Sequence, residues 1–248
     1  MTNKVILVGE GSLYIDFRET LEQAGYEIYQ PENMFSTTGE VGMALEIFNL
    51  DLNKKKKAVQ ELDHMLDSRV PILSSTLAIT ATEAASWTKN PERVVGFGTL
   101  APLSERLLVE VVSALQTDDI FVQKVSEFFG KLNKEVEIVE DEAGLVFPRI
   151  LSLIINEAAF TAMEKTASLQ DIDIAMKKGT NYPYGPLEWA DRIGLDDVLA
   201  VIYGLHRETR EERYRPASLL RKLVLAGRTG IRTGRGFYQY EQAGVVNR

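Results

Sequence analysis

The first thirty residues constrain the fold more than any other part of the chain. Residues 4–8 (KVILV) form a short β-branched run, and Gly9 and Gly11 follow it with a single residue between them. Over residues 12–24 apolar side chains recur at helical spacing, and residues 26–30 then alternate as a strand does. A strand, a glycine turn, a helix and a second strand, in this order, are typical of the opening of a doubly wound α/β fold.

The later patterns divide the chain into two parts. Five further strands are expected at residues 42–48, 70–75, 94–99, 107–113 and 135–139, with helices at 52–66 and 120–132. After Gly144 the apolar spacing is helical for several turns, and further helices are expected at 169–178, 186–193, 195–206 and 217–226, with no convincing strand before Phe237 and Tyr238. The sequence therefore predicts a Rossmann-like α/β domain with a shortened parallel sheet at residues 1–143, followed by an all-helical domain at residues 144–248.

Charge and composition exclude several functions. The formal net charge of -8 gives a nucleic-acid surface no electrostatic support, and the basic run at residues 53–57 is expected to be one solvated helix face. With no cysteine, the chain has no disulfide, no thiolate chemistry and no cysteine-ligated metal. No signal peptide is visible, and no apolar run approaches the length of about 18 residues that a membrane helix needs. We expect a cytoplasmic protein without a metal, nucleic-acid or membrane partner.

The helical half carries the most specific motifs. They are INEA (155–158), DIDIAMKKG (171–179), NYPYGPLEWAD (181–191), IGLD (193–196), YRPASLL (214–220) and AGRTGIRTGRGFYQY (226–240). In this order they closely resemble the C-terminal domain of the 3-hydroxyacyl-CoA dehydrogenases, a family that includes the 3-hydroxybutyryl-CoA dehydrogenases. The resemblance covers residues 144–241. It implies a domain that forms the homodimer and one wall of the substrate cleft.

The first domain resembles the nucleotide-binding domain of the same family, which implies NAD as the cofactor. In that pattern Gly9 and Gly11 cradle the pyrophosphate at a helix N-terminus, and Glu32 binds the adenosine ribose. Tyr14 stands where a third glycine is usual, so its ring either swings outward or fills the phosphate site. Lys55 matches a family lysine near the cofactor ribose.

The connection after Glu32 is much shorter than in the family. Residues 31–40 (PENMFSTTGE) stand where the family has a helical hairpin that contacts CoA. A crossover between parallel strands normally needs about a dozen residues or more. The resemblance therefore implies that a main contact for an acyl-CoA is absent.

Four positions carry the family's chemistry. A histidine takes the proton of the 3-hydroxyl group, a glutamate orients the histidine, and a serine and an asparagine hold the substrate oxygens. The glutamate matches Glu110 and the serine matches Ser75, whereas the spacing within residues 96–102 puts Gly98 at the histidine position. The asparagine position holds Pro148. Two of the four catalytic groups are therefore missing.

Three hypotheses follow. His64 and His206 both fall on helices that are expected to lie away from the cleft, and loss of a general base typically costs about 10²- to 10⁴-fold in rate. The first hypothesis is a degenerate family member, weakly active or inactive, that serves as a binding or interaction partner. The second is a working NAD-dependent oxidoreductase of a 3-hydroxyacyl-CoA or a small 3-hydroxy acid that uses Glu110 or water as its base. The third is a sensor of a nucleotide or an acyl-CoA.

Overall fold

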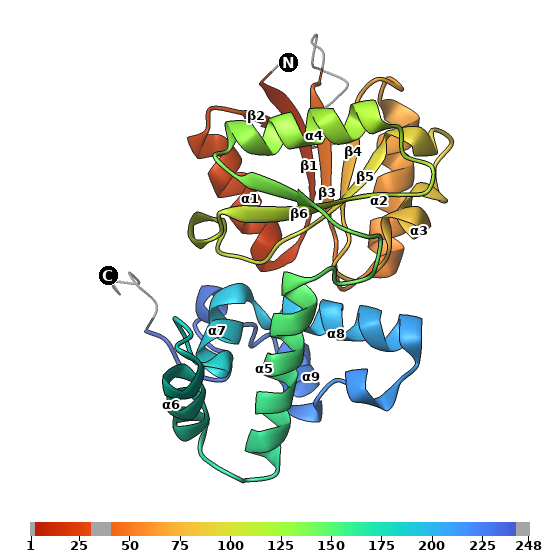
Figure 1. Cartoon of the computed structure of the whole chain (residues 1–248). Coiled ribbons are helices and arrows are strands. Elements are labelled where there is room, and N and C mark those ends of the chain that lie inside the picture. The colour runs from red at the N-terminus through yellow and green to blue at the C-terminus, as the bar shows by residue number, and fades with distance from the viewer. Residues whose placement is uncertain (1–2, 31–40, 242–248) are drawn as a thin grey trace.

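The computed structural model describes residues 3–30 and 41–241 of the chain. Figure 1 shows a twisted sheet with helices on both of its faces and, beneath the sheet, a second group of helices. Within the described residues no helix is long and apolar enough to cross a membrane. The expected succession of a Rossmann-like part and a helical part is confirmed.

The sheet has seven strands in the order β2-β1-β3-β4-β5-β6-β7. Their bounds are β1 (Lys4–Gly9), β2 (Glu27–Tyr29), β3 (Met43–Ile47), β4 (Ile72–Ser75), β5 (Val94–Gly98), β6 (Leu108–Ser113) and β7 (Glu135–Ile138). The expected parallel sheet is in fact mixed, because β6 runs antiparallel to β5 while all other pairs are parallel. The link at residues 99–107 is too short for a crossover, so the chain turns back on itself.

Alternation along the strands divides the core into two layers. Val5 and Leu7 face helices α1 (Gly11–Gln23) and α4 (Asp119–Lys131), while Ile6 and Val8 face α2 (Leu52–Met65) and α3 (Ala81–Ala85). Strands that are covered on both faces are apolar on both, which explains the unbroken KVILV run. The short helix α3 has no pattern of its own in the sequence and was not predicted.

The helical domain is built around α5 (Phe147–Met163). The other helices are α6 (Leu169–Thr180), α7 (Pro186–Ile193), α8 (Leu195–Thr209) and α9 (Ser218–Leu225), which confirms the four helices expected after residue 168. Figure 1 shows α5 leading from the sheet into this domain. The apolar core on the α1 and α4 face of the sheet continues into the helical domain through Leu151, Ile155 and Trp189.

The end of the helical domain is fixed by one buried carboxylate. Phe237 and Tyr238 do not form the expected strand; they lie in a compact turn closed by isolated bridges of Arg235. The Asp191 carboxylate accepts hydrogen bonds from the backbone N–H groups of Phe237 and Tyr238 at 2.8 and 2.9 Å, and from the Tyr240 hydroxyl at 2.9 Å. The segment after α9 is therefore held against α7 by one buried side chain.

Candidate active site

Glu110 and Gly98 are brought together by the reversal of β6. Because β6 runs antiparallel to β5, its first residues lie at the edge of the sheet where β5 ends, and Gly98 is the cross-strand partner of Glu110. Glu110 is buried, with 5% of its surface exposed. The structure therefore places two of the predicted catalytic positions side by side, as the family chemistry requires.

The Glu110 carboxylate is engaged by the backbone at the start of α5. Its two oxygens accept hydrogen bonds from the N–H groups of Val146 and Phe147, each at 2.7 Å. The first N–H groups of a helix have no partner within the helix, and a negative charge there also interacts favourably with the helix dipole. Glu110 thus caps α5, and the residue that would orient a histidine in the family has a structural role here.

Leu145 fills the space beside Gly98. A Cβ atom added to Gly98 would overlap the Leu145 side chain, which is itself buried. Leu145 has a φ of 54°, in the left-handed region that costs a residue with a side chain about 1–2 kcal/mol. The position that would hold a histidine is therefore packed by a leucine whose backbone is strained.

Pro148 and Ser75 are the other two positions of the family's catalytic set, and they do not form a pair of polar groups here. Pro148 lies in the first turn of α5, where its missing N–H leaves no hydrogen bond unmade, as its position in the sequence predicted. Ser75 ends β4 and is fully buried, and its hydroxyl has no hydrogen-bond partner among the described residues. Neither residue reproduces the pair of groups that would hold a substrate oxygen.

Lys55 lies inside the layer between α2 and the sheet. Its ammonium group donates to Glu46 Oε2 and to the carbonyl oxygen of Ser75, both at 2.6 Å, and both charged side chains are fully buried. Burial lowers the pKa of Lys55, and the Glu46 carboxylate opposes that shift. The structure therefore places this candidate cofactor residue in an internal ion pair.

Tyr14 is half-buried and bonded to the residue that follows β2. Its hydroxyl oxygen accepts a hydrogen bond from Gln30 Nε2 at 2.9 Å, so the ring lies toward the end of β2. A cavity of about 240 Å³ lies alongside, lined by Gly9, Gln30 and Lys54 among others. Glu32, the expected ribose ligand, lies outside the described residues.

The start of α8 covers the glycine turn. The Asp197 carboxylate accepts hydrogen bonds from the Leu13 N–H at 3.2 Å and from Asn49 Nδ2 at 2.8 Å. Burial, and then the neighbouring Asp196 carboxylate, raise the pKa of Asp197 to about 8, and burial also raises the pKa of Asp196. The sequence identified IGLD only as an architectural motif. The signal for the role of Asp197 was the presence of a second acid directly after this motif.

A crevice runs along α8 between the two domains. One cavity of about 410 Å³ is lined by Asn49, Tyr203, His206 and Arg207, and a second of about 270 Å³, around the glycine turn, shares Asn49 with it. His206 therefore lies at the crevice between the domains and not away from it, although neither Gly98 nor Glu110 lines this cavity.

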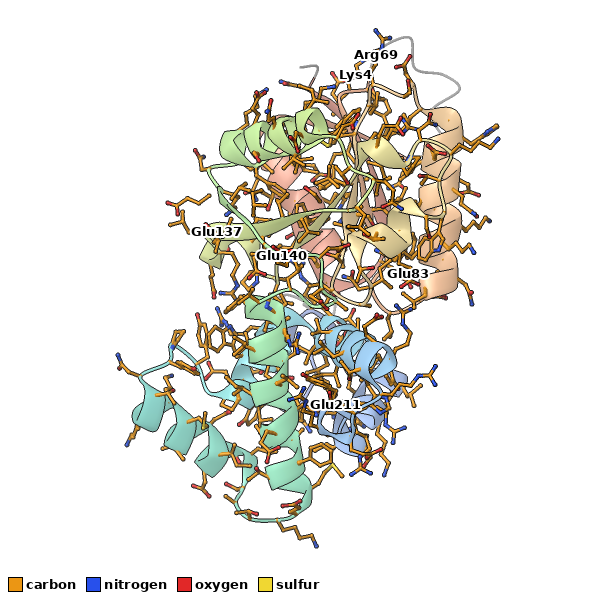
Figure 2. All side chains as sticks on the ribbon, turned by 45° about the vertical axis from the view of Figure 1, so that its right-hand side comes forward. Lys4, Arg69, Glu83, Glu137, Glu140 and Glu211 are labelled. Carbon is orange, nitrogen blue, oxygen red and sulfur yellow. The ribbon has the colours of Figure 1, made fainter. Side chains whose placement is uncertain are left out.

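An ion pair bridges the two domains at the same edge. Arg207 donates to Glu83 Oε2 at 2.6 Å. Figure 2 shows Glu83 at the border of the α/β domain that faces the helical domain. The two domains are thus linked beside the larger cavity by a partly exposed pair of charges.

A doubly wound sheet with a glycine turn is followed here by a helical domain whose first helix, α5, begins beside Glu110. This architecture is typical of the class of two-domain dehydrogenases. Residues 16–142 match the family model for the 3-hydroxyacyl-CoA dehydrogenase NAD binding domain, and residues 144–240 match the model for the C-terminal domain of the same family. The chain belongs to the 3-hydroxyacyl-CoA dehydrogenase family.

Individual proteins agree with this assignment. A 3-hydroxybutyryl-CoA dehydrogenase of Bradyrhizobium diazoefficiens is 40% identical over 192 residues, which are 77% of this chain and 66% of that protein. A probable 3-hydroxybutyryl-CoA dehydrogenase of Bacillus subtilis is 36% identical over 200 residues, covering 81% and 70% of the two chains. The crystal structure of (S)-3-hydroxybutyryl-CoA dehydrogenase from Ralstonia eutropha superposes with a TM-score of 0.76 at 29% identity, covering 98% of this chain and all of that one.

NAD is the cofactor that the matched NAD-binding domain implies. In this fold its pyrophosphate would lie at the N-terminus of α1, on the backbone N–H groups that follow Gly11. In the arrangement described here those groups face the carboxylates of Asp196 and Asp197. The residues at the glycine turn therefore do not fit the pyrophosphate while α8 stays in this position.

Proposed function

We propose that this chain is a family member that has lost the histidine-based hydride transfer and serves as a binding or interaction protein. The observation that carries the proposal is the pair of hydrogen bonds from Val146 and Phe147 to Glu110, formed beside a Gly98 whose free space is taken by Leu145. Glu110 has no histidine to orient, and its oxygens stabilise a helix.

The magnitudes support a large loss of activity. Removal of a general base typically costs about 10²- to 10⁴-fold, and removal of one donor to a developing oxyanion costs about 10²- to 10³-fold. Gly98 stands at the position of the general base, and Pro148 stands at the position of the donor that holds a substrate oxygen. Even if only one of these losses counted in full, an ordinary dehydrogenase would be left with little turnover.

The test is oxidation of NADH by acetoacetyl-CoA at high protein concentration, for the wild-type chain and for Glu110→Gln. We expect no turnover above the uncatalysed rate in either protein. Turnover in the wild type that Glu110→Gln abolishes, while circular dichroism shows the variant folded, would make Glu110 the catalytic base and would replace the proposal by the oxidoreductase alternative.

A rescue experiment follows from the contact at Gly98. Gly98→His alone is expected to stay silent, because the imidazole and the Leu145 side chain need the same space. Combining Gly98→His with Leu145→Ala and Pro148→Asn is expected to raise turnover about 10²-fold or more over the single variant, since it restores both the base and the space for it. Equal activity of the single and triple variants would show that Leu145 does not obstruct the site.

The sensor alternative is favoured by one observation, the crevice along α8. Its cavity of about 410 Å³ presents a histidine, an arginine and a tyrosine, groups that can bind an anionic ligand such as a small 3-hydroxy acid or an acyl-CoA. A triple variant that binds NADH, is folded and yet stays silent in the rescue assay would favour this alternative, because the cleft then serves a ligand without turning it over.

We also propose a homodimer formed through the helical domain. Between α5 and α6 lies a mostly apolar groove of about 570 Å³, with Ile154 and Ile172 in its lining, and nearby Ile150 and Ile174 are about half exposed. Light scattering is expected to give twice the mass of the chain for the wild type and for Ile120→Glu, an exposed isoleucine on α4, but one chain mass for Ile154→Glu. A monomeric wild type would contradict the dimer.

A further inference from the structure

We propose that Asp196 and Asp197 are built-in ligands of the glycine turn, which occupy the place of the NAD pyrophosphate and must withdraw before the cofactor binds. The proposal concerns binding and not turnover, so it does not rest on the loss of catalysis proposed above. It makes the start of α8 a determinant of cofactor affinity.

The two carboxylates engage the glycine turn and the first N–H groups of α1. The Leu13 N–H lies in the first turn of the 13-residue helix α1, directly after the glycine turn, and it donates to Asp197. This is the backbone of a doubly wound fold on which a dinucleotide places its pyrophosphate. Asp196 Oδ2 lies only 2.6 Å from the position of a Cβ atom on Gly11, so it stands directly over the turn.

The surroundings of the Asp197 carboxylate are buried. Asp197 is 2% exposed and Asn49 is 4% exposed, and the Asn49 side chain donates to Asp197 Oδ1 while Leu13 donates to Oδ2. The Oδ1 atoms of Asn49 and Asp196 are buried without a hydrogen-bond partner among the described residues. A buried polar site with unsatisfied atoms is adapted to a further polar ligand or to a different arrangement of its own groups.

The acidic side chains around the glycine turn also disfavour a pyrophosphate there. The cavity of about 270 Å³ at the turn is lined by three carboxylates, those of Glu10, Asp196 and Asp197. Among the described residues, the ion pair found there joins Lys54 to Glu10 at 2.6 Å, which leaves the two aspartates without a cationic partner. Burial raises the pKa of both aspartates, so this place disfavours negative charge even before a ligand enters, and a pyrophosphate would bring more of it without a cation to offset it. The cofactor and the aspartates therefore exclude each other.

The aspartates cannot leave the glycine turn without moving the start of α8. A Cβ atom on Gly194 would lie 2.5 Å from the Ser12 hydroxyl oxygen, so the backbone at the start of α8 packs directly on the start of α1. Displacing the carboxylates therefore means moving the two helix ends apart. The match to the family NAD-binding model begins at residue 16, so the turn itself lies outside the matched segment.

The first experiment measures equilibrium binding of NADH and of inorganic pyrophosphate by titration calorimetry. Asp196→Ala/Asp197→Ala is expected to bind NADH about tenfold or more tightly than the wild type, because the two side chains that occupy the place of the pyrophosphate are gone. It is also expected to bind pyrophosphate, which the wild type does not. The matched control is Asp119→Ala, which removes an exposed aspartate in the first turn of α4 and leaves the glycine turn unchanged. Wild-type affinities equal to those of the double variant for both ligands would overturn the proposal.

A second measurement uses the unmodified chain and does not depend on the folding of a variant. Amide hydrogen exchange of residues 193–198 is expected to increase when the wild type is saturated with NADH, because the start of α8 leaves the turn. Bound NADH with unchanged exchange in this segment would show that the cofactor and the aspartates coexist, which the proposal forbids. Neither readout depends on hydride transfer, so a failure here is distinct from a failure of the proposed function.

Discussion

Replacing Glu110 with alanine is expected to lower the free energy of unfolding by about 3 kcal/mol, as measured by urea denaturation followed by far-UV circular dichroism. The substitution leaves the partly buried N–H groups of Val146 and Phe147 without their shared acceptor, and an N–H group buried without a partner costs about 1–3 kcal/mol. It also removes a negative charge from the start of α5.

The matched control is Glu137→Ala. Glu137 is the neighbour of Glu110 in the pairing of β6 with β7, but it is exposed on the outer strand, where Figure 2 shows it at the surface. We expect its substitution to change stability by less than about 0.5 kcal/mol. Glu110→Ala as stable as the control would mean that the carboxylate does not hold α5, and its presence would then have to be explained by chemistry.

Replacing Lys55 with methionine is expected to cost about 3–5 kcal/mol of stability, because it leaves the Glu46 carboxylate buried without its cation. Methionine matches the length of the lysine stem, so the loss of packing is small. The double substitution Lys55→Met with Glu46→Gln is expected to recover most of the stability, since no buried charge then remains. Urea denaturation of the two variants measures both effects.

The control for this prediction lies on the same helix. Lys57 has 76% of its side chain exposed and is 3.6 Å from Glu61, so Lys57→Met is expected to change stability by less than about 0.5 kcal/mol. If Lys55→Met kept the stability of the wild type and instead weakened NADH binding, the role near the cofactor ribose that the family resemblance implies would be supported over the structural role.

The elements of the fold could largely be predicted from the sequence because their signals are local. Alternation and helical spacing are properties of short windows, and they indicated all seven strands and the long helices. The direction of β6 depends on how the chain turns at residues 99–107, and no window of apolar spacing carries that information. The motifs of the helical half indicated the family as well as the helices, because several of them occur together and in order.

The candidate site could be predicted only in part. The family resemblance gave the places of Gly98, Glu110 and Pro148, and the structure places Gly98 beside Glu110. What occupies the vacated space is a matter of tertiary packing, so Leu145 could not be foreseen. The same holds for Lys55, whose partner Glu46 lies on another element, and for Asp197, which meets Leu13 across 184 residues.

The carboxylate of Asp191 also sets an order of events during synthesis. Its partners Phe237, Tyr238 and Tyr240 are among the last residues of the helical domain, whereas the sheet ends with β7 about 100 residues earlier. A ribosome adding about 5–20 residues per second makes that delay about 5–20 s. During this time the core on the α1 and α4 face lacks the helices that complete it. The tail therefore docks on α7 only after the sheet and the other helices of this domain have been synthesised.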